Sequence, residues 1–294
     1  MRARTQSKSM WKLGGLSPWQ LARAVFRDIS VHNFFGRASE LAFDFLFALF
    51  PLLLVLLTLI GLFTSGRLDL QADLLAYFAD FLPSTAYALV NTTTNELAAH
   101  ASNGKLTLGI LLALWFASGG VASMISALNL AHGTREARSW LKLRAISLVL
   151  TLFISIFLLA ALLLVLVSGH VVDWIGAEFS LAPEAVALWK ALQWPAAILF
   201  MILSYSLIYY FGPNVESRRW RWITPGSAFG VLLWLAASTG LRIYLHLFNN
   251  YSATYGSLGA VMILLVWLYV TGFAFLVGGE INAEIERAAS RAAA

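Results

Sequence analysis

The sequence lacks several features on which soluble enzymes and secreted domains depend. None of its 294 residues is a cysteine, which excludes disulfide bonds, thiol chemistry and cysteine-ligated metals. Charged residues make up only 12% of the chain, about half of their usual share in soluble domains. The five histidines are scattered, and no zinc-protease, Walker or nucleophile-elbow motif is present. We therefore expect no enzyme, no catalytic, cofactor or metal site, and no nucleic-acid partner.

Long apolar segments dominate what is present. Hydrophobic residues make up 60% of the chain, and its mean hydropathy is +0.76. A helix needs roughly 20 apolar residues to cross a bilayer. Six segments qualify, at about residues 41–63, 106–131, 143–168, 191–211, 225–247 and 256–280. The sequence thus predicts an all-α polytopic membrane protein with one six-span domain over residues 41–283, between a basic segment 1–40 and a tail 284–294.

Lysine and arginine are distributed unevenly between the two expected sides of the membrane. Sixteen of them fall in segments on one side and three on the other. Because short cytoplasmic segments carry the excess of positive charge, both termini are predicted to be cytoplasmic. Pro183 is expected near the start of a helix that leads into the fourth span.

The outer segment 64–105 is too long for a simple turn. Leu70, Leu74, Leu75 and Phe78 follow helical spacing with acidic residues on the other face, and Pro83 then interrupts the pattern. We expect an amphipathic helical hairpin that lies on the outer surface or caps the bundle. An ordinary solvated loop is the alternative.

Small residues recur at positions where membrane helices pack closely. Gly119 begins a stripe of small residues at four-residue spacing in the second span, and glycines recur at 226, 230, 278 and 279. Small side chains let helix backbones approach each other where lipid supplies no hydrophobic driving force. These positions predict helix–helix contacts.

Polar residues of several spans are expected in one layer near the cytoplasmic side. The candidates for binding or gating are Glu40, Asp44, Asn129, Glu280 and Asn282. They could line a polar cavity, bind a cation or proton, or pair with arginines as a gate. Alternatively, polar residues at helix ends simply contact water and headgroups, which is the interpretation favoured for Glu284. Arg242, a secondary candidate, is expected near the outer face, where it can snorkel, meet lipid phosphates or pair with the outer hairpin.

Three stretches resemble the YihY family, also called the virulence factor BrkB family. They are LAFDFLFALFPLLL from residue 41, the region 114–151 and the region 225–287. The matching residues are Ala42, Phe43, Ala48, Leu49, Pro51, Trp115, Ser118, Asn129, Glu136, Arg138, Arg144, Pro225, Gly226, Trp234, Tyr244, Tyr255, Gly256, Trp267 and the Gly-Glu-Ile-Asn-Ala run at 279–283. The resemblance covers about residues 20–287. It departs at Asp44, where many members of the family have an uncharged residue.

The resemblance implies a six-span protein of the bacterial inner membrane with a role in the cell envelope. The leading hypothesis is a transporter or lipid-handling protein, with membrane lipids as partners and a small ion or lipid as substrate. The alternative is a non-transporting envelope scaffold that acts through the outer hairpin. The family once carried a ribonuclease BN label, which the residues of this chain do not support. Sequence leaves the oligomeric state open.

Overall fold

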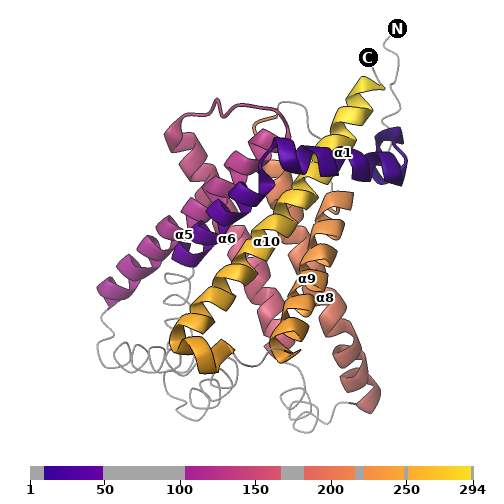
Figure 1. The fold of residues 1–294 in the computed structure, drawn as a ribbon. Coiled ribbons are helices and arrows are strands. Elements are labelled where there is room, and N and C mark those ends of the chain that lie inside the picture. The colour runs from indigo at the N-terminus through magenta and orange to yellow at the C-terminus, as the bar shows by residue number, and fades with distance from the viewer. Residues whose placement is uncertain (1–9, 49–102, 167–181, 216–221, 248–250, 293–294) are drawn as a thin grey trace.

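The computed structural model describes residues 10–48, 103–166, 182–215, 222–247 and 251–292 (Figure 1). All regular structure in these ranges is helical, as predicted. Residues 34–48 are helical as well. The labelled elements are η1 (Met10–Gly15), α1 (Pro18–Val31), α5 (Asn103–Ala131), α6 (Trp140–Leu166), α8 (Pro183–Phe211), α9 (Pro225–Leu247) and α10 (Tyr251–Arg291).

Five of these helices are long and apolar enough to cross a membrane. The qualifying stretches are Leu114–Ala131, Trp140–Ala161, Pro183–Phe211, Pro225–Leu247 and Val261–Arg291. They coincide with the second to sixth predicted spans, and Pro183 is the first residue of α8, as expected. Residues 49–63 of the first predicted span and most of the outer segment, residues 64–102, lie outside the described residues. The six-span count and the outer hairpin therefore stay predictions.

The segments expected to share one side of the membrane do lie at one end of the bundle. Arg138, between α5 and α6, donates a hydrogen bond of 2.7 Å to the carbonyl of Gly212, after α8. Asn282 of α10 accepts a 3.0 Å hydrogen bond from Gly226 N–H at the start of α9. Figure 1 shows α1 and the C-terminal end of α10 at this same end. Their common position supports the predicted alternation of the spans.

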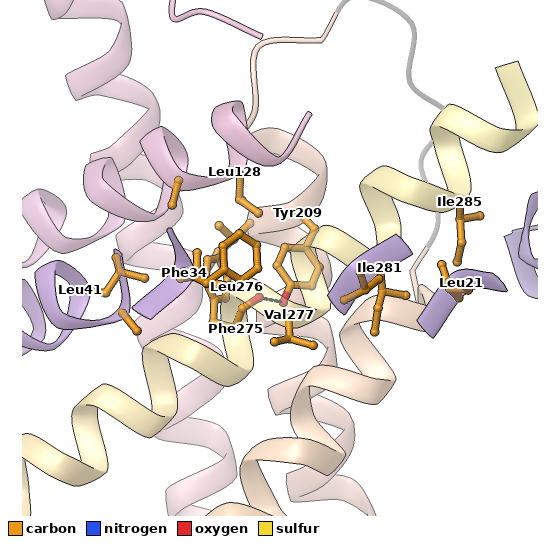
Figure 2. Packing of buried hydrophobic residues seen from close by; sticks show 14 residues of the cluster. Leu21, Phe34, Leu41, Leu128, Tyr209, Phe275, Leu276, Val277, Ile281 and Ile285 are labelled. Atoms are coloured by element: carbon orange, nitrogen blue, oxygen red, sulfur yellow. Dashed lines mark hydrogen bonds between the residues drawn. The ribbon is translucent and has the colours of Figure 1, made fainter. Parts of the chain in front are cut away.

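α1 begins with strong local signals. The Ser17 side chain accepts from Gln20 N–H, while the Gln20 side chain accepts from Ser17 N–H, which forms a capping box, and Pro18 follows at the first helical position. Leu21 and Val25 are buried and belong to the same apolar cluster as Ile281 and Ile285 of α10. α1 therefore packs against the side of α10, as Figures 1 and 2 show.

The main core lies where α10 passes α5 and α8 (Figure 2). Phe34, Leu128 and Phe275 are almost completely buried there. The Tyr209 hydroxyl donates a 2.6 Å hydrogen bond to the Phe275 carbonyl, so its polar end is satisfied inside the core. This contact fixes α8 against α10 just before Glu280.

α9 and α10 approach each other closely through glycine, which confirms the prediction for these two spans. A methyl group added to Gly278 would lie 2.5 Å from the Tyr209 hydroxyl and 2.6 Å from the Gly226 carbonyl oxygen. Gly119 differs, because no described residue lies within 4 Å of the corresponding point. Its predicted helix contact stays a prediction.

Candidate functional site: a buried charge cluster

Two helices that cross each other each supply a pair of polar residues one turn apart. Asp28 lies on α1 and His32 directly follows this helix, while Glu280 and Glu284 lie on α10. Residues four apart share a helix face, so each pair presents two side chains to the other helix. The crossing of α1 and α10 thereby gathers four titratable side chains in one place.

Arg287, one turn beyond Glu284, is the cation at the centre of this cluster. Its Nη2 lies 3.0 Å from Asp28 Oδ2 and 2.9 Å from Glu284 Oε1, and it also donates to Glu280 Oε1. The second Glu280 oxygen lies 3.1 Å from His32 Nδ1. Every carboxylate of the cluster therefore contacts a basic side chain of the same chain.

Arg27 lies at the solvent-exposed edge of the cluster. Its Nε donates a 2.8 Å hydrogen bond to Asp28 Oδ1, and its Nη2 lies 3.6 Å from Glu284 Oε1. Burial alone would raise the pKa of the Asp28 carboxyl, but the hydrogen bond from Arg27 and the nearby arginine charges outweigh it and lower this pKa below its usual value. The same hydrogen bond raises the pKa of the Arg27 guanidinium.

The cluster is buried and its fixed charges do not balance. The Glu280 side chain has no exposed surface, and those of Asp28 and Glu284 are each 6% exposed. Three carboxylates face two arginines, so neutrality requires a proton on His32 or on one carboxyl group. An unbalanced buried charge is costly, because the surrounding protein solvates it poorly. The arrangement therefore suits a site that holds a proton or a small cation.

The residue types at the centre also match those that bind divalent metals. Ligand atoms of Asp28, His32 and Glu280 all lie within 4.8 Å of one another. Imidazole and carboxylate ligands suit ions such as Zn²⁺ and Mn²⁺. Arg287 contacts two of these three residues, so its guanidinium already supplies positive charge where a metal would bind.

The three predicted carboxylates have different surroundings. Glu280 joins the cluster, whereas Glu40 is 52% exposed and pairs with Arg37 at 2.9 Å. Asp44 is half-buried and forms no ion pair or hydrogen bond with the described residues. The charged partners of Glu280 come from α1 and from its own helix, not from the first span. The interpretation of Glu284 as an interfacial residue is wrong, because its side chain is only 6% exposed and lies within the cluster.

The two predicted asparagines hold the connections at this end of the bundle. Asn282 accepts a hydrogen bond from Gly226 N–H and donates a 2.9 Å hydrogen bond to Thr224 Oγ1. The bond from Gly226 N–H satisfies a free backbone donor at the start of α9. Asn129 donates to Glu136 at 2.8 Å and accepts from Asn214 N–H at 2.6 Å. A role in substrate binding stays a prediction for both.

Arg242 lies away from the charge cluster. It is exposed on the second half of α9. The outer hairpin, one of its expected partners, falls outside the described residues. Its snorkelling and its role as a secondary candidate stay predictions.

Sequence reasoning missed Asp28 and His32 because it assigned residues 1–40 to the cytoplasm as a basic segment. A signal was present nonetheless. The Ser-Pro-Trp-Gln start at residues 17–20 is a capping box, and Leu21, Val25, Asp28 and His32 then follow at helical spacing. Such a pattern predicts a helix whose inner face ends in two titratable side chains.

The comparisons with known proteins agree on one family. The model of the family described as virulence factor BrkB matches residues 25–294. The ribonuclease-like protein YfkH of Bacillus subtilis is 33% identical over 267 residues, which cover 90% of this chain and 94% of that protein. A UPF0761 membrane protein of Tolumonas auensis is 25% identical over 252 residues, which cover 84% of this chain and 79% of that protein.

Some relatives are considerably longer than this chain. A UPF0761 membrane protein of Verminephrobacter eiseniae is 27% identical over 284 residues, which cover 92% of this chain but 64% of that protein. No solved structure matches the chain. With a family model that covers nearly its whole length and five helices able to span a bilayer, the chain belongs to the virulence factor BrkB family of membrane proteins.

Proposed function

We propose that the protein is a transporter or lipid-handling protein of the bacterial cytoplasmic membrane, and that protonation or cation binding at the charge cluster controls the contact between α1 and α10. The observation that carries this proposal is the burial of three carboxylates against only two arginines. In this proposal six helices span the membrane, both termini face the cytoplasm, and a small ion or lipid is the substrate.

Stability alone is a weak reason to bury such a cluster. Well-packed apolar side chains of similar volume are often as stabilising as a buried ion network, or more so. Ionisable residues in the membrane domains of transporters commonly belong to ion or proton pathways. The cluster can change its net charge by one unit through a single proton, and this change would alter the attraction between α1 and α10.

The ribonuclease-like name of the Bacillus relative points to a different function. Metal-assisted phosphodiester cleavage generally needs carboxylate oxygens that are available to two metal ions and to a bound water. Here arginines from the same chain contact Asp28, Glu280 and Glu284. This pairing favours a gate or coupling site over a nuclease centre.

The test is flux through purified protein in proteoliposomes. Proton entry, cation entry and movement of fluorescent phospholipid between leaflets are measured for wild type, E280Q and the control E184Q. Glu184 is an exposed carboxylate in the first turn of α8. We expect one of the three fluxes in wild type and E184Q. We expect a loss of at least about tenfold in E280Q, because this variant removes the charge on which the proposal depends.

Two results would refute the proposal. One is the absence of proton, cation and lipid flux in wild type, which would favour the scaffold function through the outer hairpin. The other is unchanged flux in E280Q. Size-exclusion profiles and thermal unfolding in detergent distinguish a folded but inactive E280Q from a misfolded one. Metal-dependent RNA cleavage that is lost in E280Q would instead establish the enzyme function.

A further inference from the structure

The face of α1 that points away from α10 combines aromatic and basic side chains. Trp19 is 77% exposed and Phe26 is 76% exposed, although the opposite face buries Leu21 and Val25. Trp19 and Phe26 are seven residues apart and so have almost the same angular position on the helix. Arg23 lies between them, four residues after Trp19 and three before Phe26, and is also exposed. These three side chains form one stripe, here called the outer stripe.

The position of α1 places this stripe beside the point where α10 changes from apolar to charged residues. The buried face of α1 meets Glu280 and Glu284, where the apolar part of α10 gives way to charged residues. Figure 1 shows α1 crossing α10 rather than running alongside the spans, close to the C-terminal end of α10. Helices with aromatic and basic side chains on one face commonly lie in the membrane interface.

We infer that the outer stripe of α1 binds the headgroups of anionic phospholipids. Tryptophan and phenylalanine would enter the boundary of the acyl chains, while Arg23 would pair with lipid phosphate. Arg27, one turn later, is 67% exposed but already pairs with Asp28, so the positive charge of the stripe comes from Arg23. Charge complementarity thus favours a lipid surface over an apolar protein partner. The inference rests on the exposed side chains of α1 and on where α1 crosses α10, and it does not depend on the transport proposal.

The absence of cysteine from the chain makes a direct test simple. Ala22 is exposed, three residues after Trp19 and four before Phe26, so A22C places a single label within the outer stripe. The protein carries a bimane label at this position and is reconstituted into nanodiscs that contain brominated phosphatidylglycerol or brominated phosphatidylcholine. Quenching of the label by either brominated lipid reports contact with that lipid. The control is S290C, because Ser290 is exposed on α10 about 15 Å beyond Glu280.

We expect quenching at residue 22 but not at residue 290, with a preference for phosphatidylglycerol. An arginine near an anionic surface contributes about a fivefold preference. R23Q in the A22C background should therefore lower the preference about fivefold. R23K should retain it, and R291Q, at the far end of α10, should leave it unchanged.

Each other outcome overturns the inference. A label at residue 22 that neither lipid quenches would mean that the stripe faces water or protein. Quenching that is equal for both lipids and insensitive to R23Q would mean apolar contact without headgroup recognition. R23K provides the check on folding, since a general loss of structure would affect R23K and R23Q together.

Discussion

Replacement of Gly278 by alanine should destabilise the bundle, because two fixed oxygen atoms surround this position. The added methyl group would lie 2.5 Å from the Tyr209 hydroxyl and 2.6 Å from the Gly226 carbonyl oxygen. The carbonyl belongs to the backbone of α9, and the hydroxyl is held by its hydrogen bond to Phe275. Neither group can move aside unless a helix shifts or a buried hydrogen bond breaks.

The expected magnitude follows from three contributions. Overpacking of a tight contact costs about 2 kcal/mol, and loss of the Tyr209 hydrogen bond costs about 1 kcal/mol more. Alanine regains about 1 kcal/mol over glycine through its higher helix propensity. The free energy of unfolding should therefore fall by about 2 kcal/mol.

Gly240 offers a matched control for the same substitution. It is an exposed position of α9, and no described residue lies within 4 Å of the added methyl group. G240A should be neutral or raise the free energy of unfolding by up to about 1 kcal/mol. The assay is reversible unfolding of the purified protein in mixed micelles with increasing SDS. The reasoning is refuted if G278A and G240A change the unfolding midpoint in the same direction and by the same amount.

Further predictions concern charged side chains at the same end of the bundle. Hydrogen bonds from Arg138 lower the pKa of Glu136 to about 2. The stabilising contribution of Glu136 should therefore be complete above about pH 4.5 and disappear as pH falls toward 2. In E136Q the unfolding midpoint should depend less on pH over this interval. R287Q should lower the free energy of unfolding by about 3 to 5 kcal/mol by leaving buried carboxylates unpaired, and the double variant E280Q/R287Q should recover part of this loss in the same SDS assay. Mn²⁺ should raise the unfolding midpoint of R287Q but not of wild type, because removal of the guanidinium makes the carboxylate oxygens available to a metal; an equal shift in both proteins would contradict this.

The membrane helices could be predicted from sequence because their length and apolar composition depend on the bilayer alone. Their ends were less predictable. The sixth predicted span ends at residue 280, yet α10 continues unbroken to Arg291. Charged residues end an apolar segment without ending a helix, because glutamate and arginine both have high helix propensity. The boundary expected at residue 284 separates the membrane domain from a cytoplasmic tail rather than ending a helix, and it stays a prediction.

The charge cluster could be predicted only in part. The positive-inside rule and helix rise indicate the depth of a residue in the membrane, and they place Glu280 in the inner layer. They do not indicate which neighbouring helix its side chain faces. The nearest partner of Glu280 outside its own helix, His32, is 248 residues away in the sequence. Such a pairing depends on how α1 crosses α10, which no local pattern specifies.

Two kinds of contact hold α1 in place, and they should respond differently to pH. Leu21 and Val25 pack on Ile281 and Ile285 through apolar surface that does not titrate (Figure 2). The charge cluster one turn further on changes its net charge whenever a proton is gained or lost. Neutralising Glu280 removes its ion pairs with His32 and Arg287, and should therefore loosen the C-terminal half of α1 while its N-terminal half stays attached. Because the core around Phe275 does not depend on these charges, the bundle should remain folded when this occurs, as a controllable gate requires.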